Sequence, residues 1–215
     1  VRLPRVLQAW IDARRPFPAR AAYLETRYDS EPYRLIPSLI ASDLEFASQD
    51  DMTARLLEET PHTARITLAD VMTPLDLIAD AIPARIADQA VKTLRRQIDI
   101  FGLHAARLDV REESSRLLRA LGEILRGLNL LSGFEKESDA TRTQILIRLL
   151  RDHPTRPASL AKHPGITEET AETWSLFQLL ARARHIYGRA LLGAFIISMT
   201  RGPADVLTVL LLARW

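Results

Sequence analysis

The sequence predicts a mainly α-helical protein with a few parallel strands. Apolar residues recur at helical spacing through most of the 215 residues, which is the pattern of amphipathic helices. Only two short segments, 103–110 and 193–199, have the apolar character of buried strands, and each runs directly into a helical pattern. Residues 1–100 are therefore interpreted as a helical segment, and residues 101–215 as two β/α units.

Prolines and capping residues divide the first hundred residues into helices. Pro16 and Pro18 are expected to make the chain irregular after a first helical stretch, because proline lacks the amide proton that a helix interior needs. Thr73, Pro74 and Asp76 are interpreted as an N-cap, a first helical residue and an acidic residue in the first turn. The expected helices are the start of 1–29, then 30–49, 52–59, 73–81 and 83–98.

The second half is expected to contain both strands. Their order with the helices is strand 103–110, helix 113–127, helix 138–150, a proline-rich loop 152–165, helix 167–187, strand 193–199 and a last helix from Gly202-Pro203. Two strands separated by about 85 residues of mostly helix would not be stable in isolation, and the last helix is apolar enough to need burial on most sides. We therefore expect the sequence to be an internal fragment of a larger chain.

Composition excludes several classes of protein. The net charge of +2 comes from interspersed acidic and basic residues, without a basic stripe, so no nucleic-acid partner is expected. The absence of cysteine rules out disulfides and cysteine-based metal sites, as is usual for a cytoplasmic protein. The apolar stretch 190–215 is broken by Arg201, Gly202 and Asp205 into pieces shorter than the roughly 20 residues that span a bilayer, so no membrane segment is expected.

A charged run at the end of the first strand is the strongest candidate for a binding site. Strand alternation places Arg107, Asp109 and Arg111 on one face, where charges are costly to bury unless they pair or bind a ligand. The carboxyl end of a strand that turns into a helix is where α/β barrels bind their ligands. A guanidinium can grip a phosphate or carboxylate with two parallel hydrogen bonds, which favours Arg111. The alternative is a structural ion pair with Asp109 or Glu113.

Two segments of the sequence also form recognisable motifs. Residues 108–116, Leu-Asp-Val-Arg-Glu-Glu-Ser-Ser-Arg, resemble the Leu-Asp-Ile-Arg-Gln-Glu-Ser-Thr-Arg segment of phosphoenolpyruvate carboxylases. Residues 193–200 and 203–207, Gly-Ala-Phe-Ile-Ile-Ser-Met-Thr and Pro-Ala-Asp-Val-Leu, resemble that family's Gly-Ala-Tyr-Val-Ile-Ser-Met-Ala and Pro-Ser-Asp-Val-Leu. The order of the motifs is that of the family. Glu112 and Leu117 depart from it, since they stand where the family usually has Gln and His.

This resemblance implies a fold and an activity. The implied fold is a helix-rich (β/α)8 barrel of the TIM type. The implied reaction converts phosphoenolpyruvate and bicarbonate to oxaloacetate and phosphate, by way of carboxyphosphate and the enolate of pyruvate, with Mg²⁺ or Mn²⁺ stabilising the enolate oxygen. The resemblance also implies a cytoplasmic homotetramer under allosteric control, whose effector-binding residues are expected outside this segment.

The resemblance assigns roles to four residues of the first motif. Arg111 matches an arginine that binds phosphoenolpyruvate on its phosphate side, and Asp109, Glu113 and Arg116 are taken as a supporting shell that orients it. The family's catalytic histidine lies in a Thr-Ala-His-Pro-Thr-like motif that is not found here, because the order at residues 60–63 is Thr-Pro-His-Thr. No catalytic residue is assigned, the metal ligands are expected outside this sequence, and the 215-residue chain alone is expected to be inactive.

The remaining polar residues favour structural roles. Ser198 and Thr200 are expected to share a strand face without chemistry, Asp205 to cap the last helix, and His104 to be a core residue of the first strand. No histidine pair has the i, i+4 spacing of a His-Glu-x-x-His metal site. The alternative function is a helical protein-interaction module whose segment 107–116 binds a partner. A different barrel enzyme acting on phosphoenolpyruvate or pyruvate is disfavoured by the second motif.

Overall fold

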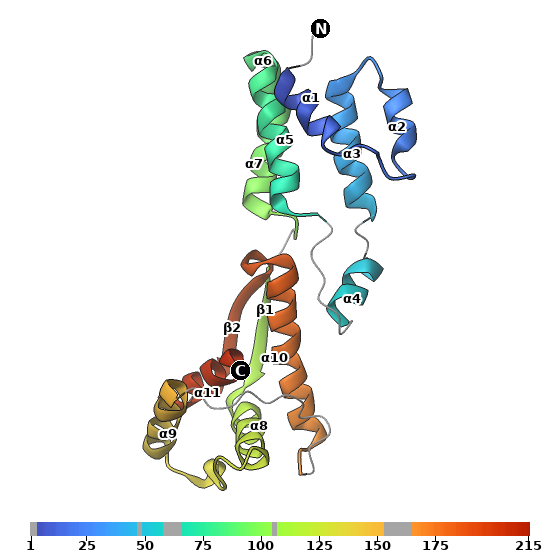
Figure 1. The fold of residues 1–215 in the computed structure, drawn as a ribbon. Helices are drawn as coiled ribbons and strands as arrows, with labels where there is room; N and C mark the ends of the chain where they lie inside the picture. The colour runs from blue at the N-terminus through green and yellow to red at the C-terminus, as the bar shows by residue number, and fades with distance from the viewer. Residues whose placement is uncertain (1–3, 47–48, 58–65, 105–106, 153–164) are drawn as a thin grey trace. The chain divides into compact units, whose positions relative to one another are not determined.

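The computed structural model describes residues 4–46, 49–57, 66–104, 107–152 and 165–215 (Figure 1). The chain divides into two compact units, Val1–Ala106 and Arg107–Trp215, which are described separately. The described residues are mainly helical and contain two parallel strands, as the sequence predicts. Within them, no helix has both the length and the apolar character needed to cross a membrane.

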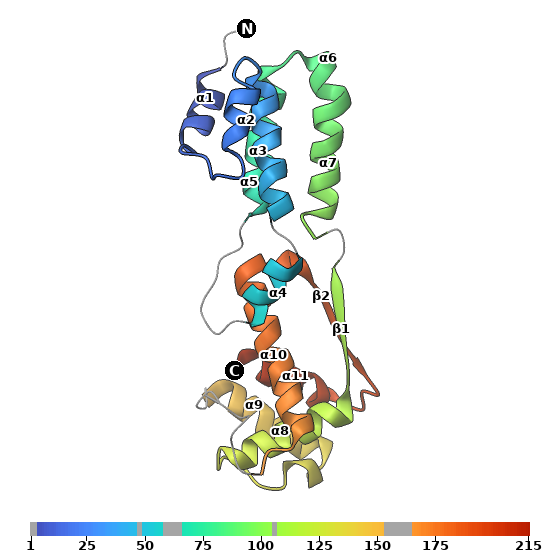
Figure 2. The same cartoon turned by 90° about the vertical axis from the view of Figure 1, so that its right-hand side faces the viewer.

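Most helices of the first unit pack around one apolar core. Its elements are α1 (Arg5–Asp12), α2 (Ala22–Arg27), α3 (Pro32–Phe46), α4 (Gln49–Leu57), α5 (Leu68–Ala81), α6 (Ala84–Ile86), a π-helical turn (Ala87–Val91) and α7 (Lys92–Phe101). Helices α1, α3 and α7 all contact α5 (Figure 2). The core side chains include Leu7, Ile11, Leu24, Ile36, Leu39, Val71, Leu75 and Ile78. Helix α2 was not predicted from the sequence.

Helix α5 begins earlier than the sequence suggested. Its N-cap is Thr67, whose side chain accepts a hydrogen bond from the Asp70 N–H, while the Asp70 carboxylate accepts one from the Thr67 N–H at 2.8 Å. This reciprocal capping box satisfies two backbone N–H groups that the helix start leaves without partners. The prediction of Thr73 as N-cap is therefore wrong, and Pro74 lies buried inside the helix.

The first strand also begins later than predicted. Helix α7 continues to Phe101 and ends at Gly102, which has φ 62°, a backbone conformation that glycine adopts without steric cost. Strand β1 runs from Leu108 to Glu113. The apolar run around residue 100 thus extends a helix, and the prediction of strand from residue 103 is wrong. His104 lies in the turn after α7 rather than in a strand.

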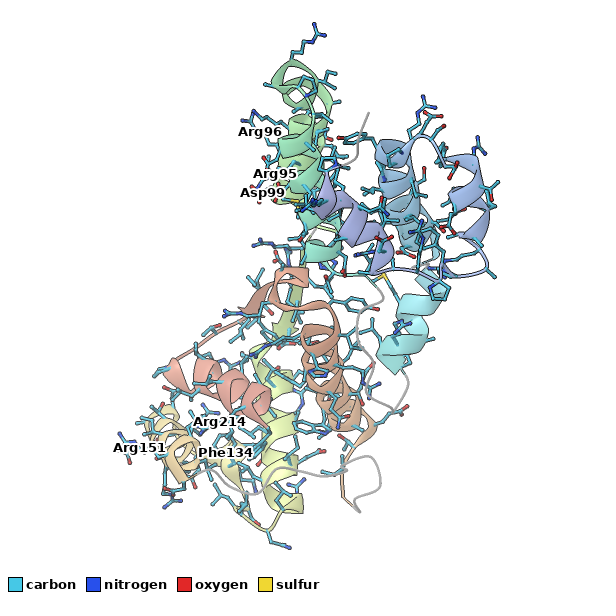
Figure 3. All side chains as sticks on the ribbon, turned by 45° about the horizontal axis from the view of Figure 1, so that its top comes forward. Arg95, Arg96, Asp99, Phe134, Arg151 and Arg214 are labelled. Carbon is cyan, nitrogen blue, oxygen red and sulfur yellow. The ribbon has the colours of Figure 1, made fainter. Side chains whose placement is uncertain are left out.

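The second unit packs helices around a larger apolar core and one face of a two-stranded parallel sheet. Its elements are β1, α8 (Ser114–Gly127), a 3₁₀ turn (Phe134–Lys136), α9 (Asp139–Asp152), α10 (Glu168–Tyr187), a second 3₁₀ turn (Arg189–Leu191), β2 (Leu192–Ser198) and α11 (Pro203–Arg214). The core includes Leu121, Ile124, Leu125, Phe134, Leu146, Trp174, Leu211 and Leu212. Phe134, labelled in Figure 3, is fully buried.

The register of the two strands decides which side chains face the helices. Phe195 stacks on Phe177 of α10 with ring centroids 5.5 Å apart, and Ile197 also packs against the core. Glu112 pairs with Ile197 and therefore belongs to the covered face, whereas Arg111, paired with Ile196, lies on the opposite face. The register is irregular between Leu108 and Val110, so regular alternation applies from Val110 onward.

The last helix leaves one side uncovered. Leu211 and Leu212 of α11 are buried in the core, but Val206 and Leu210 are 55% and 53% exposed. We expected this helix to be buried on most sides, but in the described structure one side of it is exposed.

Candidate anion-binding site at the carboxyl ends of the strands

Arg111 lies two residues before the end of β1, on the face of the sheet that the helices of the second unit do not cover. Its side chain is exposed, and among the residues that the structure describes it makes no hydrogen bond or ion pair. The ion pair with Asp109 or Glu113, which the sequence left as an alternative, is not formed in the described structure. A guanidinium without a protein partner, on an open sheet face, is suited to an anionic ligand.

The carboxylates beside Arg111 are occupied by other donors. Asp109 Oδ1 accepts a hydrogen bond from the Ala194 backbone N–H at 3.0 Å, which ties β1 to β2. Glu113 accepts one from the Ser115 hydroxyl and thereby closes the turn from strand to helix. The side chain of Glu112 is only 15% exposed and lies 3.8 Å from the Arg116 guanidinium. None of these three carboxylates is hydrogen-bonded to, or ion-paired with, the guanidinium of Arg111 in the described structure.

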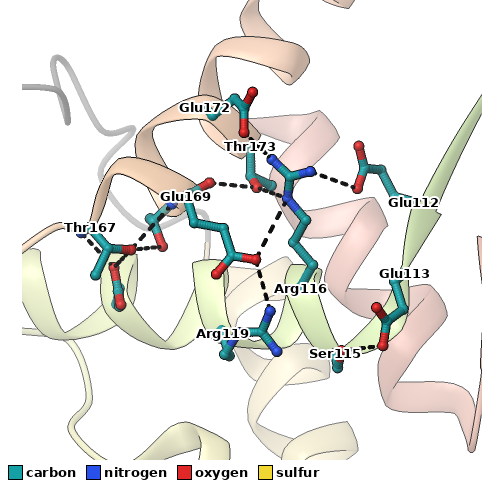
Figure 4. Close-up of polar contacts among 11 residues, drawn as sticks. Glu112, Glu113, Ser115, Arg116, Arg119, Thr167, Glu169, Glu172 and Thr173 are labelled. Atoms are coloured by element: carbon teal, nitrogen blue, oxygen red, sulfur yellow. Dashed lines mark hydrogen bonds and ion pairs between the residues drawn. The ribbon is translucent and has the colours of Figure 1, made fainter.

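Arg116 joins α8 to α10 (Figure 4). Its Nη2 lies 2.5 Å from Glu172 Oε2, its Nε donates a hydrogen bond to Thr173 Oγ1 at 3.1 Å, and Glu169 lies 4.0 Å away. Sequence reasoning missed Glu172 and Thr173, because they are more than 50 positions away and only the packing of the two helices brings them to Arg116. Through Glu112 the same guanidinium also holds the end of β1.

Further contacts fasten the first turns of α10 to α8. Glu169 binds Arg119 at 2.8 Å, and this hydrogen bond raises the pKa of Arg119. Glu123 accepts hydrogen bonds from the backbone N–H and the hydroxyl of Thr167, each at 2.9 Å. Burial is the largest single influence on Glu123 and opposes its ionisation, but the hydrogen bonds from Thr167 and Thr170 together lower its pKa. These contacts, together with those of Arg116, therefore hold α10 against α8, the helix that follows β1.

The end of β2 is tied to the end of β1. The Ser114 hydroxyl, which is buried, donates a hydrogen bond to the Met199 carbonyl at 2.8 Å. Met199 has φ 57°, a left-handed conformation that is uncommon for a residue other than glycine. Asp205 lies in the first turn of α11, as expected, but it does not cap that helix, whose N-cap is Gly202. Its carboxylate instead accepts a hydrogen bond from the Arg201 N–H, in the preceding turn, at 2.7 Å. Thr200 lies beyond the strand, which ends at Ser198, so the predicted shared strand face of these two residues is wrong.

The described residues do not fit a divalent metal. They contain no group of three or more His, Asp or Glu side chains that could hold one, and Mg²⁺ prefers several oxygen ligands. Of the histidines, His104 and His185 lie outside the strand ends. His62, His153 and His163 lie outside the described residues, as does most of the proline-rich loop.

Comparison with known proteins agrees with the two motifs. The family profile described as phosphoenolpyruvate carboxylase matches residues 3–215. A phosphoenolpyruvate carboxylase of Prochlorococcus marinus (strain MIT 9312) is 29% identical over 92% of this chain and 21% of the relative. One from Parasynechococcus marenigrum (strain WH8102) is 28% identical over 98% of this chain and 22% of the relative. One from Rhodopseudomonas palustris (strain BisA53) is 29% identical over 86% and 20%.

The matches extend well beyond the two motifs and cover both units. The chain spans about a fifth of the length of the curated relatives it matches. The match does not favour the alternative of a self-contained interaction module. Because the family profile matches nearly the whole sequence, the resemblance seen in the motifs is confirmed and the chain belongs to the phosphoenolpyruvate carboxylase family.

Proposed function

We propose that this chain contributes to an enzyme that converts phosphoenolpyruvate and bicarbonate to oxaloacetate and phosphate. The observation that carries the proposal is the family match over residues 3–215. The geometry of Arg111 supports it, because this arginine of the first motif is exposed at the carboxyl end of a strand and has no partner among the described residues. Barrel enzymes of the β/α type place their substrate-binding residues at that end.

In the proposed reaction a bicarbonate oxygen attacks the phosphorus of phosphoenolpyruvate. The bond from phosphorus to the enol oxygen breaks, which yields carboxyphosphate and the enolate of pyruvate. Carboxyphosphate then separates into carbon dioxide and phosphate, and the enolate carbon bonds to the carbon dioxide to give oxaloacetate. Arg111 would bind the phosphate by charge-assisted hydrogen bonds and offset its negative charge during the transfer. Asp109, Glu113 and Arg116 would hold the strand and turn that carry Arg111.

The rest of the active enzyme would lie outside the described residues. The two parallel strands, each followed by a helix, support a helix-rich (β/α)8 barrel of the TIM type, in which further strands would pair with the outer edges of β1 and β2. The ligands of Mg²⁺ or Mn²⁺ would come from other parts of the enzyme, as would the catalytic histidine. A cytoplasmic homotetramer under allosteric control remains our proposal for the whole protein.

The test is bicarbonate-dependent phosphate release from phosphoenolpyruvate in the presence of Mg²⁺. It compares the full-length enzyme, its Arg111→Ala variant and the isolated 215-residue chain. We expect turnover by the full-length enzyme, a loss of at least 100-fold in kcat/KM in the variant, and no turnover by the isolated chain. A full-length enzyme that is inactive with both Mg²⁺ and Mn²⁺ would refute the proposed activity. An Arg111→Ala variant with normal kcat/KM would refute the assigned residue alone.

A further inference from the structure

We infer that Arg201, in the turn after β2, is a second anion-binding residue that acts together with Arg111 on the substrate. The inference rests on the proposed function, since it extends the same site to the neighbouring strand. Its ligand class is a small molecule with two anionic groups, and phosphoenolpyruvate has a phosphate and a carboxylate.

The parallel pairing brings the two arginines to the same edge of the sheet. Glu113 and Ser198, the last residues of β1 and β2, pair with each other. Arg111 lies two positions before Glu113, which is about 7 Å along a strand, and Arg201 lies three positions after Ser198. Neighbouring strands are only about 4.8 Å apart, and arginine side chains are long. Both guanidinium groups are therefore within reach of one ligand at this edge.

The backbone that carries Arg201 is held in place on both sides. On one side, the buried Ser114 hydroxyl binds the Met199 carbonyl and fixes the turn to the start of α8. On the other side, the buried Asp205 carboxylate binds the Arg201 N–H at 2.7 Å. The left-handed conformation of Met199 is unfavourable for a residue with a side chain, and such conformations concentrate at functional sites. A position fixed before the ligand arrives reduces the entropy lost on binding.

Both arginines at this edge also lack direct partners. Arg111 and Arg201 are both exposed, and among the described residues neither guanidinium makes a hydrogen bond or ion pair. The nearby carboxylates contact other groups: Asp109 binds the Ala194 N–H, and Asp205 binds the backbone of Arg201 rather than its side chain. The Asp139 carboxylate lies against Gly202 and is ion-paired with Arg142 at 3.9 Å. An anion bound at this edge would supply the charged hydrogen-bond acceptors that both guanidinium groups lack in the described structure.

The experiment compares Arg201→Gln with Arg201→Lys in the full-length enzyme. We expect Arg201→Gln to raise the KM for phosphoenolpyruvate at least tenfold, with the KM for bicarbonate within twofold of wild type. Arg201→Lys should recover part of the loss, because it restores the charge without the two-pronged hydrogen bonds. The matched control is Arg189→Gln, because Arg189 is also exposed and without a described partner but precedes β2, at the opposite end of the strand. It should leave both KM values unchanged.

Several results would overturn the inference. One is a normal KM for phosphoenolpyruvate in Arg201→Gln, or an increase no larger than that of Arg189→Gln. Another is a lower thermal midpoint with unchanged KM, which would indicate a structural ion pair with a carboxylate elsewhere in the enzyme. Loss of activity in Arg111→Ala together with normal kinetics in Arg201→Gln would refute this inference and leave the proposed function intact.

A binding measurement covers the case in which the proposed function itself fails. If the wild-type enzyme does not consume phosphoenolpyruvate, inorganic phosphate is titrated by calorimetry into wild type and both glutamine variants. Binding that weakens at least fivefold in Arg201→Gln, but not in Arg189→Gln, would support an anion site for a different reaction. Equal binding by wild type and Arg201→Gln, or no binding by either, would overturn the inference.

Discussion

The contact of Arg116 with four acceptors on two elements can be tested by replacing it with methionine. The Arg116→Met variant keeps the apolar stem of the side chain but removes the guanidinium that contacts Glu172, Thr173, Glu169 and Glu112. Because these contacts connect α8, α10 and the end of β1, we expect the effect to be local. It should appear as more frequent opening of the first turns of α10 and of the turn that follows β1.

The burial of the partners determines the expected magnitude. Glu172 is 73% exposed and Glu169 is 47% exposed, and ion pairs of that kind contribute about 0–1 kcal/mol each. The side chain of Glu112 is only 15% exposed, and leaving a mostly buried polar group without its partner costs about 1–3 kcal/mol. We therefore expect a local destabilisation of about 2 kcal/mol, most of it from Glu112, which corresponds to roughly 30-fold faster exchange of the affected amides.

Native-state hydrogen exchange of the full-length protein measures this effect. Arg119→Met is the control, because Arg119 forms an ion pair with the exposed Glu169 at the surface of the same helix, and we expect its effect to be about fivefold or less. The decisive comparison is the double variant Arg116→Met with Glu112→Gln. If the cost comes from an uncompensated carboxylate, removing that charge should recover about half of the lost protection. No recovery, or equal effects of Arg116→Met and Arg119→Met, would refute the reasoning.

Two further predictions concern stability elsewhere in the chain. Phe134→Ala should destabilise the second unit by about 3–5 kcal/mol, because it removes a fully buried ring, whereas Phe101→Ala, at a residue 60% exposed in α7, should shift the urea midpoint much less. The hydrogen bond from the Thr67 hydroxyl is the main cause that lowers the pKa of Asp70. The pair therefore stabilises α5 fully when the pH is above the ordinary Asp pKa of about 3.9, and this contribution is lost as the pH falls through the lowered pKa of Asp70. Hydrogen exchange of α5 at several pH values should show that loss in wild type and a smaller loss in Thr67→Val, which keeps only the hydrogen bond from the backbone N–H. An identical pH dependence in both proteins would contradict the reasoning.

The helices whose starts were predicted correctly are those with a capping residue or a proline at the first turn. Thr167 was expected to start a helix and is the N-cap of α10, and the last helix starts at Pro203 as expected. The first strand was placed too early, because the apolar run that begins at Phe101 suits the end of a helix as well as a strand. Gly102 was the local signal for the correct boundary, since a glycine commonly follows the last turn of a helix and here has a positive φ.

In the candidate site, too, the sequence predicted the residues with local signals and missed those that depend on tertiary packing. The charged run pointed to Arg111 because the residue type and its place in the strand are local properties. The partners of Arg116 on α10 could not be found in that way, because nothing near residue 116 indicates which helix face packs against it. Arg201 was considered only as a break in an apolar stretch, and its interest depends on the parallel pairing of β1 with β2.

The hydrogen bond between Ser114 and Met199 joins positions 85 residues apart, and this separation has a consequence for how the protein is made. Closing a loop of that length costs about 4 kcal/mol of chain entropy, so β1 and β2 should pair only after the intervening helices have formed. At about 5–20 residues per second on the ribosome, β2 is synthesised roughly 4–17 seconds after β1. During that interval an unpaired strand is exposed to association with other chains, and charged side chains on a strand oppose such association. Asp109, Arg111, Glu112 and Glu113 would thus protect the nascent chain from aggregation before any of them contributes to a substrate site.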